Sequence, residues 1–453
     1  MEVSKSIMEE SPFTPFHKRL TINSAGGPFI DGYILSIIGI ALTQMGTQFH
    51  LNAFWSGLIG ASALAGIFIG GFFLGYLTDL IGRKVMYIAG VALITVFSIL
   101  QMFAHTPLEL CILRFVIGIA IGADYPIATS LLAEFAPRKQ RGLMLGSLIL
   151  MWYIGATVAD VVGYFLLGMG DNSWKWMLGS GAIPSLILLL MRLGTPESPR
   201  WLISKGRFDK ARVIVKRVFG QDADIDGLIE ESTEKTRFSK MFERGYLKRT
   251  MFVSFFWMFQ IVPLFAIYTF GPQILDAFHL GKGNIAFIGE AVISFFFLLG
   301  CIPALFLVNT MGRRPLIIWC FAFMTLGLLI LGVFPNASIW VIIGGFAIYA
   351  IFSGGPNVLD FIYPNELFPT EIRASAVGVA TSISRIGSFI GTFVLPYSLD
   401  KIGIGSTMMI GAGISLLGLI ISIAWAPETR GLTLAETSAV KGPEQKIPAR
   451  KAN

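Results

Sequence analysis

Six ionisable side chains lie inside long apolar stretches of this sequence, where a charged group is costly. They are Asp31, Arg114, Asp124, Asp160, Asp360 and Arg385, while Glu290 lies nearer the end of its apolar stretch. A charge at the centre of a lipid bilayer costs about 2.5–3.5 kcal/mol on insertion scales, so such residues are functional candidates. Carboxyl groups exchange protons and guanidinium groups bind anions. These residues therefore indicate reversible binding of protons and of a small polar solute.

Apolar helices must hold these residues in place. Of the 453 residues, 54% are hydrophobic and 14% are charged, with a mean hydropathy of +0.70, which is more apolar surface than a water-soluble domain can bury. A bilayer core needs about 20 apolar residues per helix. We predict an all-α membrane protein with spans near 24–46, 54–77, 85–104, 108–134, 143–168, 175–194, 250–275, 284–308, 315–334, 338–362, 374–397 and 404–425. The first span is expected to remain as an anchor, because it has no small-residue cleavage site.

Basic residues occupy alternate loops between the predicted spans. They are Arg83, Lys84, Arg138, Lys139, Arg141, Arg313, Arg314 and Arg373. Because short loops rich in Lys and Arg stay in the cytoplasm, we predict a multi-pass protein of the cell inner (plasma) membrane with both termini cytoplasmic. The net charge of +7 then reflects topology and contact with anionic lipids rather than nucleic-acid binding.

The sequence indicates no cofactor, metal centre or enzyme site. The cysteines Cys111, Cys301 and Cys320 all fall inside predicted spans, and the four histidines are scattered. Neither a zinc-binding spacing nor a nucleophile triad is visible. We therefore expect no disulfide, no metal, no cofactor and no enzymatic activity.

The predicted spans form two halves around a polar central stretch. We expect a cytoplasmic N-terminal segment at 1–23, a six-helix bundle at 24–195, a cytoplasmic loop with short helices at 196–249, a second bundle at 250–427 and a cytoplasmic tail at 428–453. Three short patterns recur at matching places in the two halves. The pairs are Gly82-Arg83-Lys84 with Gly312-Arg313-Arg314, Glu134 and Arg141 with Glu366 and Arg373, and Pro196-Glu197-Ser198-Pro199-Arg200-Trp201-Leu202 with Pro427-Glu428-Thr429-Arg430-Gly431-Leu432.

These repeated motifs resemble those of the major facilitator superfamily, in its sugar-porter and related organic-ion (metabolite:H+ symporter) branch. The resemblance covers essentially the whole chain. It implies two pseudo-symmetric six-helix bundles related by an axis along the membrane normal, with the solute site between them near the midplane. It also implies secondary active transport by alternating access, carried out by a monomer.

The repeated motifs place acidic and basic residues together at predicted cytoplasmic helix ends. By resemblance, one charge network contains Asp79, Arg83, Glu134, Arg141, Glu197 and Arg200, and the other contains Arg313, Arg314, Glu366, Arg373 and Glu428. The networks are expected to latch the two halves and to separate when the cytoplasmic side opens. The alternative is that they only set topology and cap helices. Asn309 replaces the acid of the family pattern, which weakens the second network.

Asp31 and Arg114 are candidates for proton coupling, because related proton-coupled carriers have an acid and an arginine in these two helices. A poorly hydrated site and a nearby guanidinium act in opposite directions on a carboxyl, so solute or conformation can switch its proton. The alternative is a static ion pair that orients two helices. Asp160 is a second candidate proton carrier. Asp124 stands about 15 Å from Arg114 along a helix, towards the cytoplasmic half, and completes the proton-coupling set.

The predicted solute site draws mainly on the second half. Sugar porters bind hydroxyl groups with a seventh-span pattern of which Gln260 remains, but Pro263 and Phe265 replace the following Gly and Asn. Arg385 resembles instead an arginine of organic-anion carriers, with a structural partnership to Asp360 as the alternative. The candidate solute-binding residues are Tyr33, Trp257, Gln260, Phe265, Tyr268, Asp360 and Arg385.

We therefore expect proton-coupled symport of a small organic anion, such as an aromatic, nicotinate-like or sugar acid. Two alternatives stay open: a neutral sugar or polyol porter and, outside transport, a sensor or channel with a transporter fold. The expected partners are the solute, protons and the lipid bilayer.

Overall fold

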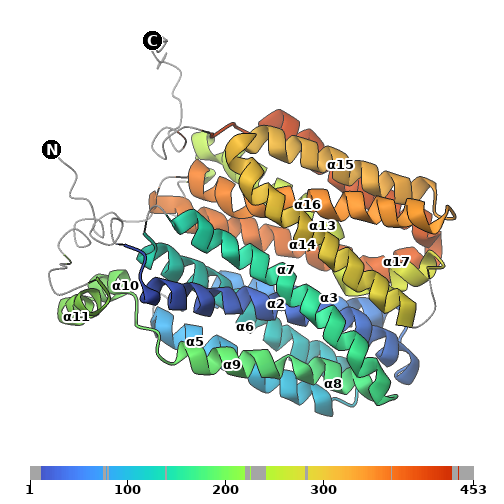
Figure 1. Ribbon diagram of the computed structural model, residues 1–453, viewed down its shortest axis with the longest axis horizontal. Coiled ribbons are helices and arrows are strands. Elements are labelled where there is room, and N and C mark those ends of the chain that lie inside the picture. The colour runs from blue at the N-terminus through green and yellow to red at the C-terminus, as the bar shows by residue number, and fades with distance from the viewer. Residues whose placement is uncertain are drawn as a thin grey trace, which may run out of the picture.

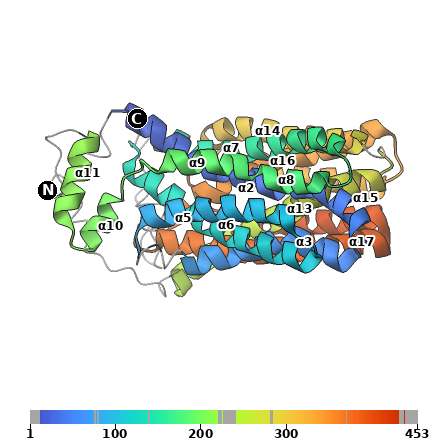
Figure 2. The same ribbon diagram turned by 90° about the horizontal axis from the view of Figure 1, so that it is seen from below.

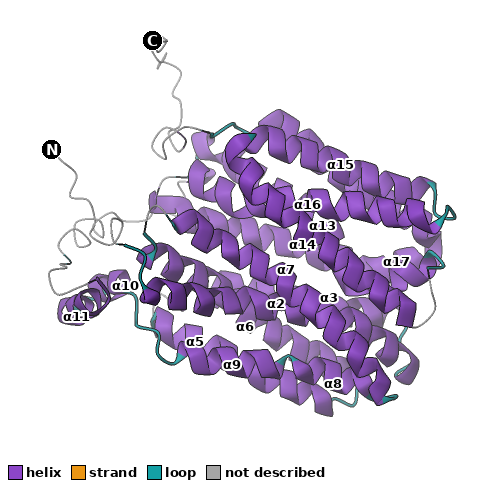
Figure 3. Ribbon diagram, in the orientation of Figure 1, coloured by secondary structure: helices purple, strands orange, loops and turns teal. Residues whose placement is uncertain are grey.

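The computed structural model describes residues 12–74, 78, 81–137, 140–219, 225, 241–280, 284–368, 370–430 and 437. These residues form helices and loops without a strand, in agreement with the predicted all-α fold class (Figure 3). The first half contains α2 (Pro15–Gln48), α3 (Ala53–Ile69), η1 (Gly70–Leu74), α5 (Arg83–Leu100), η2 (Gln101–Phe103), α6 (Pro107–Phe135), α7 (Arg141–Leu166), η3 (Leu167–Met169), α8 (Ser173–Ser180) and α9 (Ala182–Arg192). The short helices α10 (Pro199–Ser204) and α11 (Phe208–Phe219) follow. The second half contains α13 (Arg244–Ala277), α14 (Asn284–Thr310), α15 (Arg313–Val333), α16 (Ile339–Leu367) and α17 (Thr370–Trp425).

The number of membrane-crossing helices agrees with the prediction. Eleven helices within the described residues are long and apolar enough to cross a membrane. The last of them, α17, consists of two helices that meet at Gly403, whose φ of 77° lies in the left-handed region that favours glycine. The described part of the chain therefore holds twelve crossing stretches.

The first helix begins at Pro15, well before the predicted start at residue 24. The reason is that His17 is buried against the end of α6. The N–H of Thr14 donates to Nδ1 of His17 (3.1 Å), and Nε2 of His17 lies 2.9 Å from the carbonyl oxygen of Phe135. This anchorage extends α2 through a segment whose polar residues had indicated a flanking loop.

The two halves lie side by side, with α2 to α9 in one and α13 to α17 in the other (Figure 1). Helices α10 and α11 lie beyond the end of the bundle at which α2 begins, as Figures 1 and 2 both show. We call this end of the bundle the near end. The opposite end, at which α2 ends, is called the far end. The seam between the halves is made by α7 against α14, α3 against α17 and α2 against α13.

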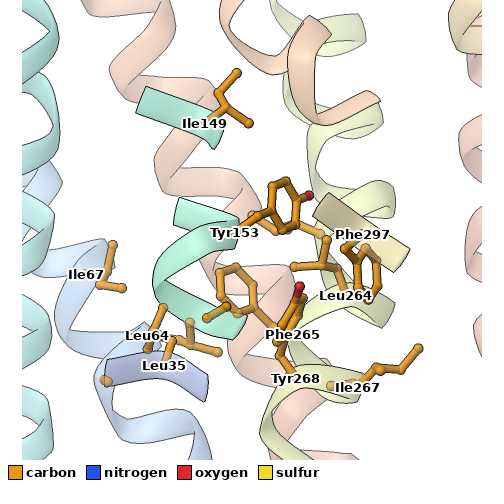
Figure 4. Close-up of a cluster of buried hydrophobic side chains, with 14 of the residues drawn as sticks. Leu35, Leu64, Ile67, Ile149, Tyr153, Leu264, Phe265, Ile267, Tyr268 and Phe297 are labelled. Atoms are coloured by element: carbon orange, nitrogen blue, oxygen red, sulfur yellow. The ribbon is translucent and has the colours of Figure 1, made fainter. Parts of the chain in front are cut away.

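Aromatic side chains fill much of this seam (Figure 4). The ring of Tyr268 on α13 packs edge-on against Trp152 of α7, with centroids 5.2 Å apart, and in a tilted arrangement against Phe297 of α14 at 5.0 Å. Tyr153 of α7 stacks on Phe297 at 6.1 Å. Such pairs add about 0.5–1.5 kcal/mol each beyond the burial of their area. The halves are therefore held together here by packing around a few polar groups.

Glycines allow α3 and α6 to approach closely within the first half. A Cβ atom at Gly118 would overlap the carbonyl oxygen of Ala63, and one at Gly66 would overlap that of Phe115. Small residues at such crossings let helix backbones touch in membranes. This close packing holds α3 and α6 together within the first half.

Candidate functional site

A central cavity of about 40 Å³, large enough for a few water molecules, lies in the seam. Both halves contribute to its wall. The lining residues are Asp31, Ile149, Trp152, Tyr153, Trp257, Ile261, Leu264, Phe265, Asn357, Asp360 and Arg385. Six of these positions carry a carboxyl, a guanidinium, an amide or an indole N–H, and the remainder are mainly apolar. A largely apolar pocket with a few converging polar groups is typical of a small-molecule site.

Asp31 brings a carboxyl to this cavity from the first half. The indole Nε1–H of Trp152 donates to its Oδ2 (2.9 Å), while Oδ1 has no hydrogen-bond partner. The approach of α2 to α7 depends on Gly32, because a Cβ there would overlap the carbonyl oxygen of Trp152. Asp31 therefore presents one free oxygen in a buried site next to the opposite half.

Arg385 brings a guanidinium from α17, and it forms no ion pair with any of the described residues. Its central carbon lies 5.1 Å from the centre of the Phe265 ring, and its Nε and Nη1 atoms are buried without hydrogen-bond partners. Asp360 on α16 also has a free carboxyl oxygen, and it forms no ion pair with Arg385. The structural Asp360–Arg385 pair, which was the alternative for these residues, is therefore not formed. The positive charge of Arg385 acts on Asp31 and on Asp360 across the cavity.

Arg114 does not meet Asp31, contrary to the expectation of a pair between their helices. Its Nε donates to the carbonyl oxygen of Ile59 on α3 (3.0 Å), and its Nη2 is buried without a partner. The side chain follows the close packing of α6 on α3 and turns away from the cavity. The cation that acts on Asp31 comes from the other half of the molecule, at Arg385.

Asp124 is held in a buried ion pair and is therefore not a free proton carrier, which corrects the prediction for this residue. Its partner is Arg192 at the end of α9, which donates from Nη1 and Nη2 to the two carboxylate oxygens. Arg192 also donates to the carbonyl oxygen of Asn23 and covers the ring of Tyr87 at 3.5 Å. This cluster joins four helices of the first half towards the near end. The sequence analysis missed Arg192 because a basic residue at the end of a span is usually exposed.

The remaining predicted solute and proton residues divide between the cavity and its surroundings. Trp257 and Phe265 line the cavity. Tyr33 instead shares a hydrogen bond with Ser180 inside the first half (2.7 Å), and Gln260 lies 3.5 Å from Ser353 inside the second. Asn357, which the sequence analysis did not name, lines the cavity one turn before Asp360. Asp160 and Tyr268 lie farther along the seam.

Carboxylates cap two helices at the near end in the same way in each half. Glu197 accepts hydrogen bonds from the backbone N–H groups of Arg83 and Lys84, which begin α5 (3.0 and 3.1 Å). Glu428 accepts from those of Arg313 and Arg314, which begin α15 (both 3.1 Å). An acidic group at a helix N-terminus satisfies free N–H groups and the helix dipole. The repeated motifs therefore act as matching caps.

A bidentate ion pair adds to the cap in the second half. Arg313 donates from Nη2 and Nε to the two carboxylate oxygens of Glu366 (2.7 and 3.2 Å), and Thr429 donates to Glu366 as well. These contacts tie helix ends within one half. Asp79 and the side chains of Glu134, Arg141, Arg200 and Arg373 lie outside the described residues, so the latch between the halves stays a prediction.

Comparisons with known proteins agree with this architecture. A family model described as "Sugar (and other) transporter" matches residues 20–440. A protein named for metabolite transport, YaaU of Escherichia coli K12, is 49% identical over 95% of this chain and 96% of its own length. The inner membrane metabolite transport protein YgcS of the same organism is 35% identical over 98% of each chain.

The chain belongs to the sugar transporter family of the major facilitator superfamily. A solved structure of the Escherichia coli xylose transporter XylE, in a partially occluded inward open conformation, superposes with a TM-score of 0.80 at 21% identity, covering 93% of this chain and 100% of that chain. At that identity the match shows the fold alone. The predicted family, the two-bundle fold and a multi-pass membrane transporter of small molecules are thus confirmed.

The helix cap at Glu428 makes part of the free energy of unfolding of this transporter depend on pH. Partial burial acts to raise the pKa of Glu428, but backbone N–H donors from Arg430, Arg313, Arg314 and Thr429 outweigh it, and the pKa is lowered from its ordinary value of 4.5. A lowered pKa stabilises the folded state above the ordinary value, and this stability is lost as pH falls through the folded pKa.

We therefore expect Glu428→Ala to reduce stability by about 0.5–2 kcal/mol at neutral pH, as loss of a helix cap usually does. The deficit relative to the wild type should shrink as the solution is acidified below pH 4.5. Thermal unfolding of both proteins in detergent over a pH series measures this. The exposed Asp400, replaced by Asn, is the control and should leave the curve unchanged. A Glu428→Ala deficit that stays constant with pH would show that the carboxylate charge does not contribute.

Proposed function

We propose that this transporter carries out proton-coupled symport of a small organic anion, with a hydroxylated acid such as a sugar acid as the best-fitting class. The observation that carries the proposal is the buried guanidinium of Arg385, which faces the central cavity without an ion-pair partner. Guanidinium binds carboxylates in bidentate geometry. The aromatic rings of Trp257 and Phe265 provide an apolar surface beside it.

Solute and proton binding support each other in this arrangement. The positive charge of Arg385 acts on both Asp31 and Asp360. A solute carboxylate that pairs with Arg385 neutralises that charge, and two buried anions without a cation are unfavourable. The carboxyls then take up protons, so the solute should bind more tightly at lower pH.

The cavity is too small for such a solute without movement of the two halves. We propose that the bundles at 24–195 and 250–427 rock against each other, so that the cavity opens at one end at a time. The near end, where α2 begins and where α10 and α11 lie (Figures 1 and 2), is proposed to face the cytoplasm, with the protein in the inner membrane of the cell and both termini on the cytoplasmic side. The charged residues of the near end then act as the latch of that side, in a monomer.

A neutral sugar or polyol is the second candidate solute. The family description and two relatives favour it: the glucose transporter GlcP of Staphylococcus epidermidis at 31% identity and the major myo-inositol transporter IolT of Bacillus subtilis at 29%. In that case Asp31, Asn357 and Asp360 would bind hydroxyl groups, and Arg385 would donate to a hydroxyl rather than to a carboxylate.

Matched ligand pairs separate the two candidates. We expect glucuronate and nicotinate to raise the melting temperature of the purified protein, more at about pH 5.5 than at about pH 7.5, and glucose and nicotinamide to have no such effect. Counterflow in proteoliposomes with the stabilising ligand then tests transport. Stabilisation by the neutral members alone, independent of pH, would replace the anion proposal with the sugar proposal. Binding without counterflow would instead indicate a sensor or channel.

A further inference from the structure

A second buried polar cluster lies in the seam between the central cavity and the far end. Asp160 stands two helical turns beyond Tyr153 on α7, about 10 Å along the helix axis and on the same face. Across the seam, Glu290 and Ser294 stand one turn apart on α14 and also share a face. Asp160 is fully buried and Glu290 is 2% exposed. The two carboxyls therefore come from opposite halves and meet inside the protein.

Within the part of the chain that the structure describes, no cation is paired with either carboxyl. Ser294 donates its hydroxyl hydrogen bond to Oδ2 of Asp160, but Oδ1 of Asp160 and both carboxyl oxygens of Glu290 are buried without partners. Asp160 acts electrostatically on Glu290. Among the described residues, no Lys, Arg or His forms an ion pair with either of them.

Among the described residues, the titratable side chain placed against both acids is neutral: Tyr268 of α13 interacts with Asp160 and Glu290, and Tyr349 of α16 lies next to Tyr268. Tyr153, on the side of the central cavity, interacts with Tyr268 and also with Asp360. The hydroxyl of Tyr268 is itself buried without a hydrogen-bond partner. The backbones of α2 and α13 pack closely against Glu290. A Cβ atom at Gly39 of α2 would lie 2.9 Å from Glu290 Oε1, and one at Gly271 of α13 would lie 2.8 Å from the same atom.

We propose that Asp160 and Glu290 form a second proton-binding site, separate from the central cavity, that closes the seam at the far end of the bundle. Two adjacent carboxylates that are buried from solvent, with no ion-pair partner among the described residues, repel each other and lack solvation. With protons bound, the closed packing carries no charge, and each acid becomes a hydrogen-bond donor. When α7 separates from α14, water reaches both groups and they ionise. This inference rests on the alternating-access cycle proposed above.

Each proton that the closed state holds and the open state releases should change the ratio of closed to open molecules by about tenfold per pH unit. Spin labels at Thr47→Cys and Asp276→Cys, at the exposed far ends of α2 and α13, report the width of the seam by pulsed electron resonance. The native cysteines Cys111, Cys301 and Cys320 are buried. The empty protein should show the shorter distance at about pH 5.5 and a longer one at about pH 8.5, values that bracket the titration of a buried carboxyl.

Neutral variants provide the decisive comparison. The variant with Asp160→Asn and Glu290→Gln should keep the shorter distance at both pH values, because its side chains cannot ionise. Asp31→Asn, in the central cavity, should keep the pH response. A wild-type distance that does not change with pH, or a double variant that responds as the wild type does, would overturn the proposal. Closure at about pH 8.5 on replacing K+ by Na+ would also overturn it, in favour of a metal-cation site.

The readout requires no solute, so its failure is distinct from that of the proposed symport. An unchanging distance in a protein with normal counterflow would reject the carboxyl pair alone. A preserved pH response in a protein that shows no counterflow with any ligand would reject the symport and leave the pair standing.

Discussion

Replacement of Arg385 by Gln is expected to weaken binding of a carboxylate solute by about 30- to 1,000-fold. This is equivalent to about 2–4 kcal/mol, the usual cost of removing one partner from a buried charged hydrogen-bonded pair. The guanidinium is the only cation in the wall of the central cavity among the described residues. Gln retains hydrogen-bonding capacity but neither the charge nor the bidentate geometry. Isothermal titration or a thermal-shift series with the carboxylate found in the ligand screen measures the loss.

Asp31→Asn is the matched control for Arg385→Gln, because it changes the opposite charge in the same cavity. An anion should still bind this variant, and with less dependence on pH, since one proton acceptor is gone. Its concentrative uptake under a pH gradient should fall while counterflow persists. If Arg385→Gln binds the carboxylate as tightly as the wild type, Arg385 does not contact the solute and the anion proposal fails.

Most of the fold could be predicted from the sequence, because each of its determinants is local. Apolar length marks the membrane-crossing helices, and the repeated motifs mark the two halves. The join at Gly403 also agrees with the predicted eleventh and twelfth spans. The start of α2 was missed because it depends on the burial of His17 against Phe135, a contact between residues distant in the sequence.

The candidate site could be predicted only in part. A charge in an apolar stretch marked Asp31, Asp360 and Arg385, all of which line the central cavity, since that signal is local. The residues that each of these side chains contacts, however, lie far away in the sequence. Arg114 lies in the expected helix but turns towards Ile59, and Asp31 is bonded by Trp152, which had no polar signal of its own.

The residues packed around a buried acid also determine whether it forms an ion pair or stays unpaired. Asp124 and Asp160 are alike in sequence, each a single acid in an apolar stretch. The first has Arg192 beside it, whereas the second has Ser294 and the unpaired Glu290 across the seam. Only the packing of helices distinguishes a structural ion pair within one half from a titratable pair between the halves.

The second large effect expected is on stability, at the ion pair between Asp124 and Arg192. Arg192→Met should destabilise the protein by about 3–5 kcal/mol, because it leaves a buried carboxylate without a counter-charge. It also removes the donors to the carbonyl oxygens of Asn23 and Tyr87. Asp124→Leu should cost a similar amount, since it strands the guanidinium. The Asp124 carboxylate cannot move towards α2, because it already packs against Gly27, where a Cβ atom would overlap it.

The double variant Asp124→Leu/Arg192→Met should recover much of this loss, because replacing both members of a buried ion pair by apolar groups removes the uncompensated charge. Unfolding in detergent of the wild type, the two single variants and the double variant forms a complete cycle. For the double variant to be more stable than either single variant, the coupling must exceed the loss of one single variant, about 3–5 kcal/mol. The exposed pair of Lys401 and Asp400, 3.2 Å apart, is the matched control, and Lys401→Met should cost less than about 1 kcal/mol. Additive losses in the cycle would mean that Asp124 and Arg192 stabilise the first half separately, through packing alone.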